Sequence, residues 1–313
     1  MKALLFPGQG SQKVGMGKEI YENYNFVKDI FQKADECLKY SISKIILDGP
    51  TDKLQLTENT QPAILTVSYS IYTILKEEYG FNFDSFEYFA GHSLGEYSAL
   101  VCAEALDFED AIYLLHERGK SMQNAVPVGK GMMLAVMGIN LPQLKEFIIN
   151  RKNKDGVCEI ANDNSDGQII ISGDKNSILL FQNELKENKI KTIPLNVSAP
   201  FHCSLMKPAS EIMIEKIKNI NFKNPNKKII SNVTATETMS PEKIKDLLIE
   251  QIYSSVRWRE SIINMSSMGV KSFFEVGPGK ILSGMVKRTI KNISCFSINT
   301  IDDIKSFNDK FKK

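Results

Sequence analysis

The stretch Glu87-Tyr88-Phe89-Ala90-Gly91-His92-Ser93-Leu94-Gly95 decides how the surrounding chain folds. Its first four residues predict an apolar strand, and the run from Glu96 to Ala105 predicts a helix. Between them lies a G-x-S-x-G pattern, in which a sharp strand-to-helix turn needs small residues on both sides of the serine. The serine hydroxyl then stands at a helix N-terminus, where the helix dipole and the N–H of Leu94 can stabilise an oxyanion. The stretch therefore predicts Ser93 as a nucleophile, with a chance match in a glycine-containing turn as the alternative.

Strands and helices alternate on both sides of this turn. Before it, the apolar run Lys2–Phe6 predicts a buried strand that breaks into Pro7-Gly8-Gln9-Gly10, and helical spacing occurs at about 17–39 and 62–79. After residue 199 the alternation resumes, with strands expected at Lys228–Asn232, Lys271–Val276 and Ser294–Ile298. This alternation is typical of an α/β domain built on a parallel sheet.

A different pattern occupies the chain from about residue 129 to residue 197. It predicts strand, helix, strand, strand, helix and strand over Met132–Met137, Leu141–Arg151, Val157–Ala161, Gln168–Ser172, Asn176–Asn188 and Lys191–Leu195. This βαββαβ order is the ferredoxin-like motif. We therefore predict an α/β protein with a large, discontinuous, α/β-hydrolase-like domain over residues 1–127 and 199–313 and an inserted ferredoxin-like domain over residues 128–198.

The composition is that of an ordinary globular protein and argues against several functional classes. The net charge of the 313 residues is +2, which gives no electrostatic footprint for nucleic acid. No apolar run approaches the ~20 residues that span a bilayer, and the residues after Met1 predict a strand rather than a signal peptide. The five cysteines form no metal-like cluster with histidine and are expected to be reduced. We expect a cytoplasmic monomer without a metal or a bound cofactor.

A serine hydroxyl needs a base to act as a nucleophile at neutral pH, and the chain contains three histidines. His92 adjoins Ser93 and is expected to shape the turn or to contact an acyl group. His116 lies in a helical pattern and is interpreted as an ordinary surface or partly buried histidine. His202 lies where the chain re-enters the large domain, and such junctions border clefts. We therefore predict His202 as the base.

Motifs that occur in a fixed order along the chain indicate one family. They are Phe6-Pro7-Gly8-Gln9-Gly10-Ser11-Gln12, Gly91-His92-Ser93-Leu94-Gly95-Glu96-Tyr97-Ser98-Ala99, Arg118-Gly119-Lys120-Ser121-Met122-Gln123, His202-Cys203-Ser204-Leu205-Met206 and Glu275-Val276-Gly277-Pro278-Gly279-Lys280. With them the chain resembles the malonyl-CoA:acyl carrier protein transacylase family along nearly its full length. Each motif alone would be weak evidence, whereas the set is highly specific.

The resemblance implies a Ser–His dyad without a carboxylate. In that arrangement Ser93 is acylated, His202 takes the serine proton, and a backbone carbonyl near Gln251 orients the histidine. The oxyanion hole is expected to consist of the backbone N–H groups of Gln9 and Leu94.

The resemblance also implies how the acyl group is selected. Arg118 matches the family's substrate arginine, and a guanidinium can hold the malonyl carboxylate through two parallel hydrogen bonds. Phe201 resembles the residue whose bulk excludes a branched methylmalonyl group, although a lone Phe is more often simple packing. Asn162 and Asn164 resemble residues that line the cleft opposite the serine, as contacts for the substrate or the carrier.

The expected function is transfer of the malonyl group from malonyl-CoA to the phosphopantetheine thiol of holo acyl carrier protein, through a seryl-malonyl intermediate, for fatty-acid synthesis. The partners implied are malonyl-CoA and the carrier, with no nucleic acid and no membrane. A trans-acting polyketide acyltransferase is an alternative that the sequence leaves open. A serine hydrolase or thioesterase shares the serine turn, but it usually has its base near the C-terminus, where this chain has no histidine after His202. A non-catalytic carrier-binding protein is disfavoured because Ser93, His202 and Arg118 are all present.

Overall fold

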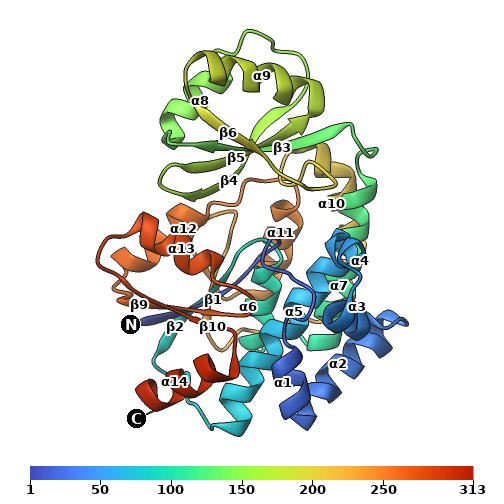
Figure 1. Cartoon of the computed structure of the whole chain (residues 1–313), viewed down its shortest axis with the longest axis vertical. Coiled ribbons are helices and arrows are strands. Elements are labelled where there is room, and N and C mark those ends of the chain that lie inside the picture. Colours follow the sequence, from blue (N-terminus) through green and yellow to red (C-terminus); the bar gives the residue numbers. More distant parts are fainter. Residues whose placement is uncertain (313) are drawn as a thin grey trace.

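Two β-sheets organise the chain in the computed structural model, which describes residues 1–312 (Figure 1). The larger sheet has the strand order β10-β9-β1-β2-β7-β8. Its strands are β1 Lys2–Phe6, β2 Phe86–Gly91, β7 Lys228–Ile230, β8 Glu237–Thr238, β9 Ser272–Val276 and β10 Ser294–Ile298. Neighbouring strands pair in parallel except β7 and β8, which are antiparallel. The edge strand β8 was not predicted, because 2 residues are too few to show an alternating pattern.

Strand β1 lies in the middle of the larger sheet, which explains why its sequence is apolar. Ala3, Leu4, Leu5 and Phe6 are fully buried. Leu4 and Phe6 belong to one hydrophobic cluster, whereas Ala3 and Leu5 belong to another. Successive side chains of a strand point to opposite faces, so the two clusters cover the two faces of the sheet.

Helices pack against both faces of the larger sheet, and their side chains complete each hydrophobic cluster. The first cluster contains side chains from α2, α5, α6, α7, α10, α11 and α14, and the second contains side chains from α12 and α13. The helices of this part of the chain are α1 Lys18–Asn23, α2 Asn25–Leu38, α3 Ile42–Asp48, α4 Thr51–Gln55, α5 Thr57–Thr73, the π-helical turn η1 Ile74–Glu78, α6 Gly95–Cys102, α7 Phe108–Asn124, the 3₁₀ turn η2 Ser204–Met206, α10 Lys207–Lys218, α11 Pro241–Gln251, α12 Trp258–Ser267, α13 Ile281–Thr289 and α14 Ile301–Phe311. Among residues 1–312, none of the helices combines the length and the apolar character needed to cross a membrane.

Two predicted helices have different ends in the structure. The helix expected at about 17–39 is divided at Tyr24, whose backbone is extended. Helix α5 begins at Thr57 rather than at Pro62, so the proline lies inside it. A proline within a helix leaves the carbonyl four residues earlier without its usual N–H donor. That carbonyl, of Glu58, lies 3.2 Å from Nδ1 of His116, which can donate in place of the missing N–H.

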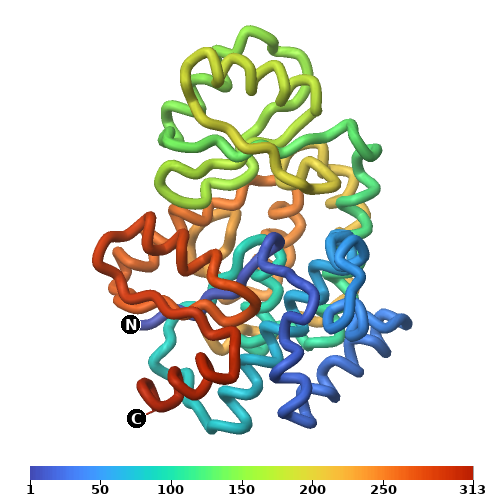
Figure 2. Tube along the Cα trace, in the orientation of Figure 1, coloured from blue at the N-terminus to red at the C-terminus, as the bar shows by residue number. Residues whose placement is uncertain are grey.

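The smaller sheet is built from the middle of the chain, which Figure 2 shows in green and yellow above the remainder. Its strand order is β4-β5-β3-β6, and neighbouring strands are antiparallel. Its elements are β3 Gly131–Met137, α8 Leu141–Ile149, β4 Cys158–Ser165, β5 Gln168–Asp174, α9 Lys175–Glu187 and β6 Lys191–Pro194. Strands and helices follow one another here in the order that the sequence predicts.

Strand β4 is longer than predicted and connects the smaller sheet to the rest of the molecule. It continues beyond the expected end at Ala161 to Ser165, through polar residues that are buried. Asn162 forms a β-bridge with Val256, and the carboxylate of Asp163 lies 3.0 Å from Nε of Arg259 on α12. The sequence predicted that this strand ends at Ala161, whereas the structure continues it and buries its polar residues against partners from the larger part of the chain.

The turn between β2 and α6 is as sharp as the glycine spacing predicts. Ser93 adopts a left-handed backbone conformation, with a φ of 53°. A Cβ atom on Gly91 would lie 1.9 Å from the backbone of Gly95, and one on Gly95 would lie 2.2 Å from the carbonyl oxygen of Phe6. Only glycine allows the strand, the turn and the helix to approach this closely.

We expect Gly95→Ala to lower the free energy of unfolding by about 3 kcal/mol or more, because the new methyl group meets rigid backbone. The control is Gly284→Ala in α13, where the nearest atom to an added Cβ is the end of the Arg288 side chain at 3.7 Å. Removing a glycine from a helix should stabilise the protein by about 0.5–1 kcal/mol. Urea denaturation of both variants measures the two changes, and equal values would contradict the account of the turn.

Candidate active site

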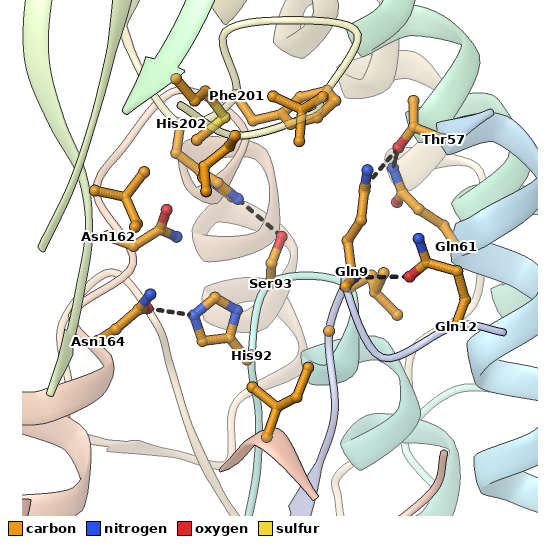
Figure 3. A pocket seen from close by; sticks show the side chains of 18 of the residues that line it. Gln9, Gln12, Thr57, Gln61, His92, Ser93, Asn162, Asn164, Phe201 and His202 are labelled. Atoms are coloured by element: carbon orange, nitrogen blue, oxygen red, sulfur yellow. Dashed lines mark hydrogen bonds between the residues drawn. The ribbon is translucent and has the colours of Figure 1, made fainter. Parts of the chain in front are cut away.

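A cavity of about 400 Å³ lies between the two sheets. Figure 3 shows polar side chains from both parts of the chain directed into it. Most residues that the sequence singles out contribute to its lining, namely Gln9, His92, Ser93, Leu94, Arg118, Asn162, Asn164, Phe201 and His202. Gln251 lies at the end of α11, and its backbone carbonyl contacts His202 from outside the lining. The structure therefore brings together residues that are more than two hundred positions apart in sequence.

Ser93 and His202 form a buried hydrogen-bonded pair. Oγ of Ser93 lies 2.8 Å from Nε2 of His202, and the two residues are 8% and 5% exposed. Nδ1 of His202 lies 2.9 Å from the carbonyl oxygen of Gln251. Because a carbonyl only accepts hydrogen bonds, the proton is on Nδ1, and Nε2 is left to accept the serine proton.

The ring of His202 is neutral at physiological pH. Burial, followed by the positive charge of Arg118, lowers the pKa of His202 to about 3. Among residues 1–312, no acidic side chain forms a salt bridge or a hydrogen bond with this histidine. A neutral imidazole can take a proton from Ser93, and the contact with the backbone oxygen of Gln251 sets its tautomer.

Two backbone N–H groups are free beside the serine. The N–H groups of Gln9 and Leu94 donate no hydrogen bond within the described part of the chain, and both residues line the cavity. The loop that contains Gln9 is held at its side chain, where Oε1 accepts from Oγ1 of Thr57 at 2.9 Å. Leu94 directly precedes α6, so its N–H lies at the positive end of the helix dipole.

Arg118 is a buried cation that faces the serine. The residue is 1% exposed. Nη1 donates to Oε1 of Gln61 at 2.7 Å. Nη2 donates both to Oγ of Ser93 at 3.1 Å and to Oε1 of Gln251 at 2.9 Å. Within residues 1–312 it has no salt bridge to a carboxylate, and its Nε has no partner. Burial lowers the pKa of the guanidinium, which nevertheless stays charged. A buried guanidinium held only by neutral acceptors is suited to bind an anionic group.

His92 belongs to the wall of the cavity rather than to the dyad. Its Nε2 lies 2.9 Å from Oδ1 of Asn164 on β4, and its ring meets that of Trp258 at a centroid distance of 5.5 Å. Burial lowers its pKa, so the ring is neutral. His92 therefore supports the turn and joins it to the smaller sheet.

Three buried polar residues of the site were not predicted. Asn232 accepts the N–H of Ser93 at its Oδ1 and donates from Nδ2 to the carbonyl of Gly91, each at 2.7 Å. Glu96 accepts from the side chain of Gln251 at 2.7 Å, and Gln61 holds Arg118. Asn232 follows β7, the strand next to β2, and side chains at neighbouring carboxyl ends of parallel strands meet. Its position directly after a strand that neighbours β2 is the sequence feature that could have indicated Asn232 as a residue of the site.

The motif that begins at Glu275 also has a structural role. The carboxylate of Glu275 accepts the N–H groups of Leu282 and Ser283 at 3.0 and 2.8 Å. It thereby satisfies free donors in the first turn of α13, whose residues Leu282 and Met285 line the cavity. The motif fixes one wall of the site.

An α/β fold that presents a histidine-bonded serine at a strand-to-helix turn defines the class of enzymes that attack acyl groups with a serine nucleophile. Comparisons with known proteins identify the family. The chain matches the acyl transferase domain family over residues 3–308. It is 44% identical to the malonyl CoA-acyl carrier protein transacylase of Bacillus subtilis (strain 168), over 96% of this chain and 94% of that protein. The protein of the same name from Escherichia coli (strain K12) is 38% identical over 95% of each chain.

Solved structures agree with this assignment. The acyl-carrier-protein-S-malonyltransferase from Bartonella henselae has a TM-score of 0.96 at 38% identity, covering 100% of this chain and 99% of that one. A type II PKS acyl-carrier protein in complex with its malonyl-transacylase has a TM-score of 0.94 at 35% identity, covering 99% of each chain. This chain belongs to the acyl transferase family, among its malonyl-CoA:acyl carrier protein transacylases.

We expect Asn232→Ala to lower the free energy of unfolding by about 2 kcal/mol, because the N–H of Ser93 and the carbonyl of Gly91 lose their buried partner. Urea denaturation measures the loss. The control is Asn224→Ala, since Asn224 is exposed and its removal should change stability by no more than about 0.5 kcal/mol. An Asn232 variant as stable as this control would show that the side chain does not hold the turn.

Proposed function

We propose that this chain transfers the malonyl group of malonyl-CoA to the phosphopantetheine thiol of holo acyl carrier protein, and thereby supplies extender units for fatty-acid synthesis. One observation carries the proposal: Oγ of Ser93 lies 2.8 Å from the base His202 and 3.1 Å from the buried cation Arg118. A nucleophile between a base and an anion site fits an acyl group that ends in a carboxylate. Membership of the family that contains the malonyl CoA-acyl carrier protein transacylases also supports malonyl-CoA as the substrate and acyl carrier protein as the acceptor.

Ser93 attacks the thioester carbonyl while its proton passes to Nε2 of His202. The C–O bond forms, the C–S bond breaks, and His202 returns the proton to the leaving thiolate of CoA. The thiol of the carrier then gives its proton to His202 and attacks the ester of Ser93. The new C–S bond forms as the C–O bond breaks, and His202 returns the proton to Oγ of Ser93. In both half-reactions the free N–H groups of Gln9 and Leu94 are suited to bind the oxyanion. This chemistry uses no metal ion and no bound cofactor.

Arg118 accounts for a preference for malonyl over acetyl groups, because only malonyl has a carboxylate that the guanidinium can bind. The three acceptors of its guanidinium, from Gln61, Ser93 and Gln251, are neutral. A malonyl carboxylate can therefore replace Gln61 at Nη1 and Ser93 at Nη2 and form a charged pair, while Gln251 keeps its contact. Arg118 is also one cause of the low pKa of His202. A bound carboxylate neutralises this charge and makes His202 a stronger base. Selectivity is therefore expected in the rate of acylation as well as in binding.

The domain boundaries form part of the proposal. We assign residues 1–127 and 199–313 to a large domain of the α/β-hydrolase type and residues 128–198 to a ferredoxin-like domain. The strand order β4-β5-β3-β6, with a helix after β3 and another after β5, supports the ferredoxin-like assignment. Phe201, which is buried beside the base and lines the cavity, is assigned to exclusion of a branched acyl group.

We expect Arg118→Ala to reduce kcat/KM for malonyl transfer to holo acyl carrier protein by about 100-fold, because charge-assisted hydrogen bonds are worth about 1.5–3 kcal/mol. Acetyl transfer should change far less, since acetyl has no carboxylate. Arg118→Lys, which retains the charge but loses the paired geometry, should fall between these values. Parallel assays with malonyl-CoA and acetyl-CoA make the comparison, and equal losses for both substrates would refute the carboxylate role of Arg118.

A further inference from the structure

The side-chain amide of Gln251 lies between two buried groups of opposite charge. Its Oε1 accepts from Nη2 of Arg118 at 2.9 Å, and its Nε2 donates to Oε2 of Glu96 at 2.7 Å. The three residues are 1–2% exposed. No step of the proposed reaction uses Glu96, although its carboxylate is buried next to the residues that carry out the reaction.

The charges on the two sides fix the orientation of the amide. If the amide were reversed, its NH₂ group would face the guanidinium of Arg118 and its oxygen would face the carboxylate of Glu96, and both contacts would be repulsive. The same residue also holds the base, because the backbone oxygen of Gln251 accepts from Nδ1 of His202 at 2.9 Å. The position of Gln251 therefore sets the positions of His202 and Arg118 together.

Glu96 also supports the serine turn. Its Oε2 accepts the N–H of Asn232 at 3.0 Å, and Asn232 in turn accepts the N–H of Ser93 at 2.7 Å. One carboxylate oxygen thus supports the residues that hold the nucleophile, the base and the anion site.

We propose that Glu96 is a positioning residue, which as a carboxylate fixes Gln251 and through it aligns His202 and Arg118 for acylation of Ser93. This inference rests on the proposed function. The proposal requires the side-chain amide of Gln251 between Glu96 and Arg118. A direct ion pair of Glu96 with Arg118 would occupy the guanidinium donors that the malonyl carboxylate needs. With the amide in between, Glu96 offsets part of the buried positive charge, and the substrate displaces only neutral acceptors.

The ionisation of Glu96 gives the proposal a measurable signature. Burial raises the pKa of Glu96 to about 7. The titratable or charged groups that face it are Arg118 on α7 and Tyr97 on α6, and burial raises the pKa of Tyr97 to about 12. The pKa of His202 is lowered to about 3, and that of His92 also lies below its ordinary value. Near pH 7, Glu96 is therefore the group of this cluster whose charge changes, and it becomes a carboxylate as the pH rises.

The test is the single-turnover rate of Ser93 malonylation at saturating malonyl-CoA, measured by rapid quench and mass spectrometry in the wild type, Glu96→Gln, Gln251→Ala and the double variant. The rate is expressed per active site that becomes malonylated. We expect the wild-type rate to fall as the pH drops below about 7, the range in which Glu96 loses its charge. Glu96→Gln retains an oxygen that can accept from Asn232, and it should be about 10-fold slower at pH 8 and lose this pH dependence.

The double variant distinguishes positioning from general support of the fold. If Glu96 acts through Gln251, adding Glu96→Gln to Gln251→Ala causes no further loss of rate. A residue that only stabilises the fold would lower the melting temperature and leave the rate per active site unchanged, and that result would overturn the proposal. Additive losses in the double variant would overturn it as well.

Failure of the inference and failure of the proposed function give different results. A wild type that forms no malonyl-enzyme contradicts the proposed function, whereas a malonylated wild type with an unchanged Glu96→Gln rate contradicts only the role of Glu96. If Glu96→Gln does not fold, the pH profiles of the wild type and Gln251→Ala decide. An acidic limb near pH 7 that is absent from Gln251→Ala supports the proposal, and a limb common to both refutes it.

Discussion

The buried positive charge of Arg118 is the constraint on which the rest of the site depends. A guanidinium in the interior needs acceptors for its donors, and the two terminal nitrogens of Arg118 find them in Gln61 on α5, Ser93 in the β2–α6 turn and Gln251 on α11. These hydrogen bonds connect three elements that are far apart in sequence. Because the acceptors are neutral, the cation is held in place without a carboxylate partner in the described part of the chain. This arrangement is the basis on which we propose that Arg118 binds the carboxylate of an acidic substrate.

The fold supplies the geometry that this arrangement needs. The neighbouring parallel strands β2 and β7 place the serine turn and Asn232 side by side at their carboxyl ends, where the chain turns sharply into α6. The smaller sheet closes the other side of the cavity with the buried polar end of β4, and His202 lies on the segment that returns from it. Burial from both sides keeps His202 neutral, and a neutral base is a condition for the first proton transfer.

The sequence was informative where local chemistry restricts the choice. Glycines around Ser93 predicted the turn, the scarcity of histidines directed attention to His202, and a set of ordered motifs indicated Arg118 and Gln9. The structure places Gln9, Ser93, Arg118 and His202 around one cavity. Asn232, Glu96 and Gln61 were not found, because each acts through a long-range hydrogen bond that leaves no periodic signal. The buried extension of β4 was missed for a related reason: polar residues look like a loop until their partners on other elements are known.

Trapping of the covalent intermediate would show whether Ser93 carries the malonyl group between CoA and the carrier. The wild-type enzyme would be mixed with malonyl-CoA, quenched in acid, and mapped by peptide mass spectrometry before and after addition of holo acyl carrier protein. We expect a malonyl ester on Ser93 that disappears as malonyl-carrier forms. An adduct on another residue, no adduct, or release of malonate to water without transfer to the carrier would contradict it.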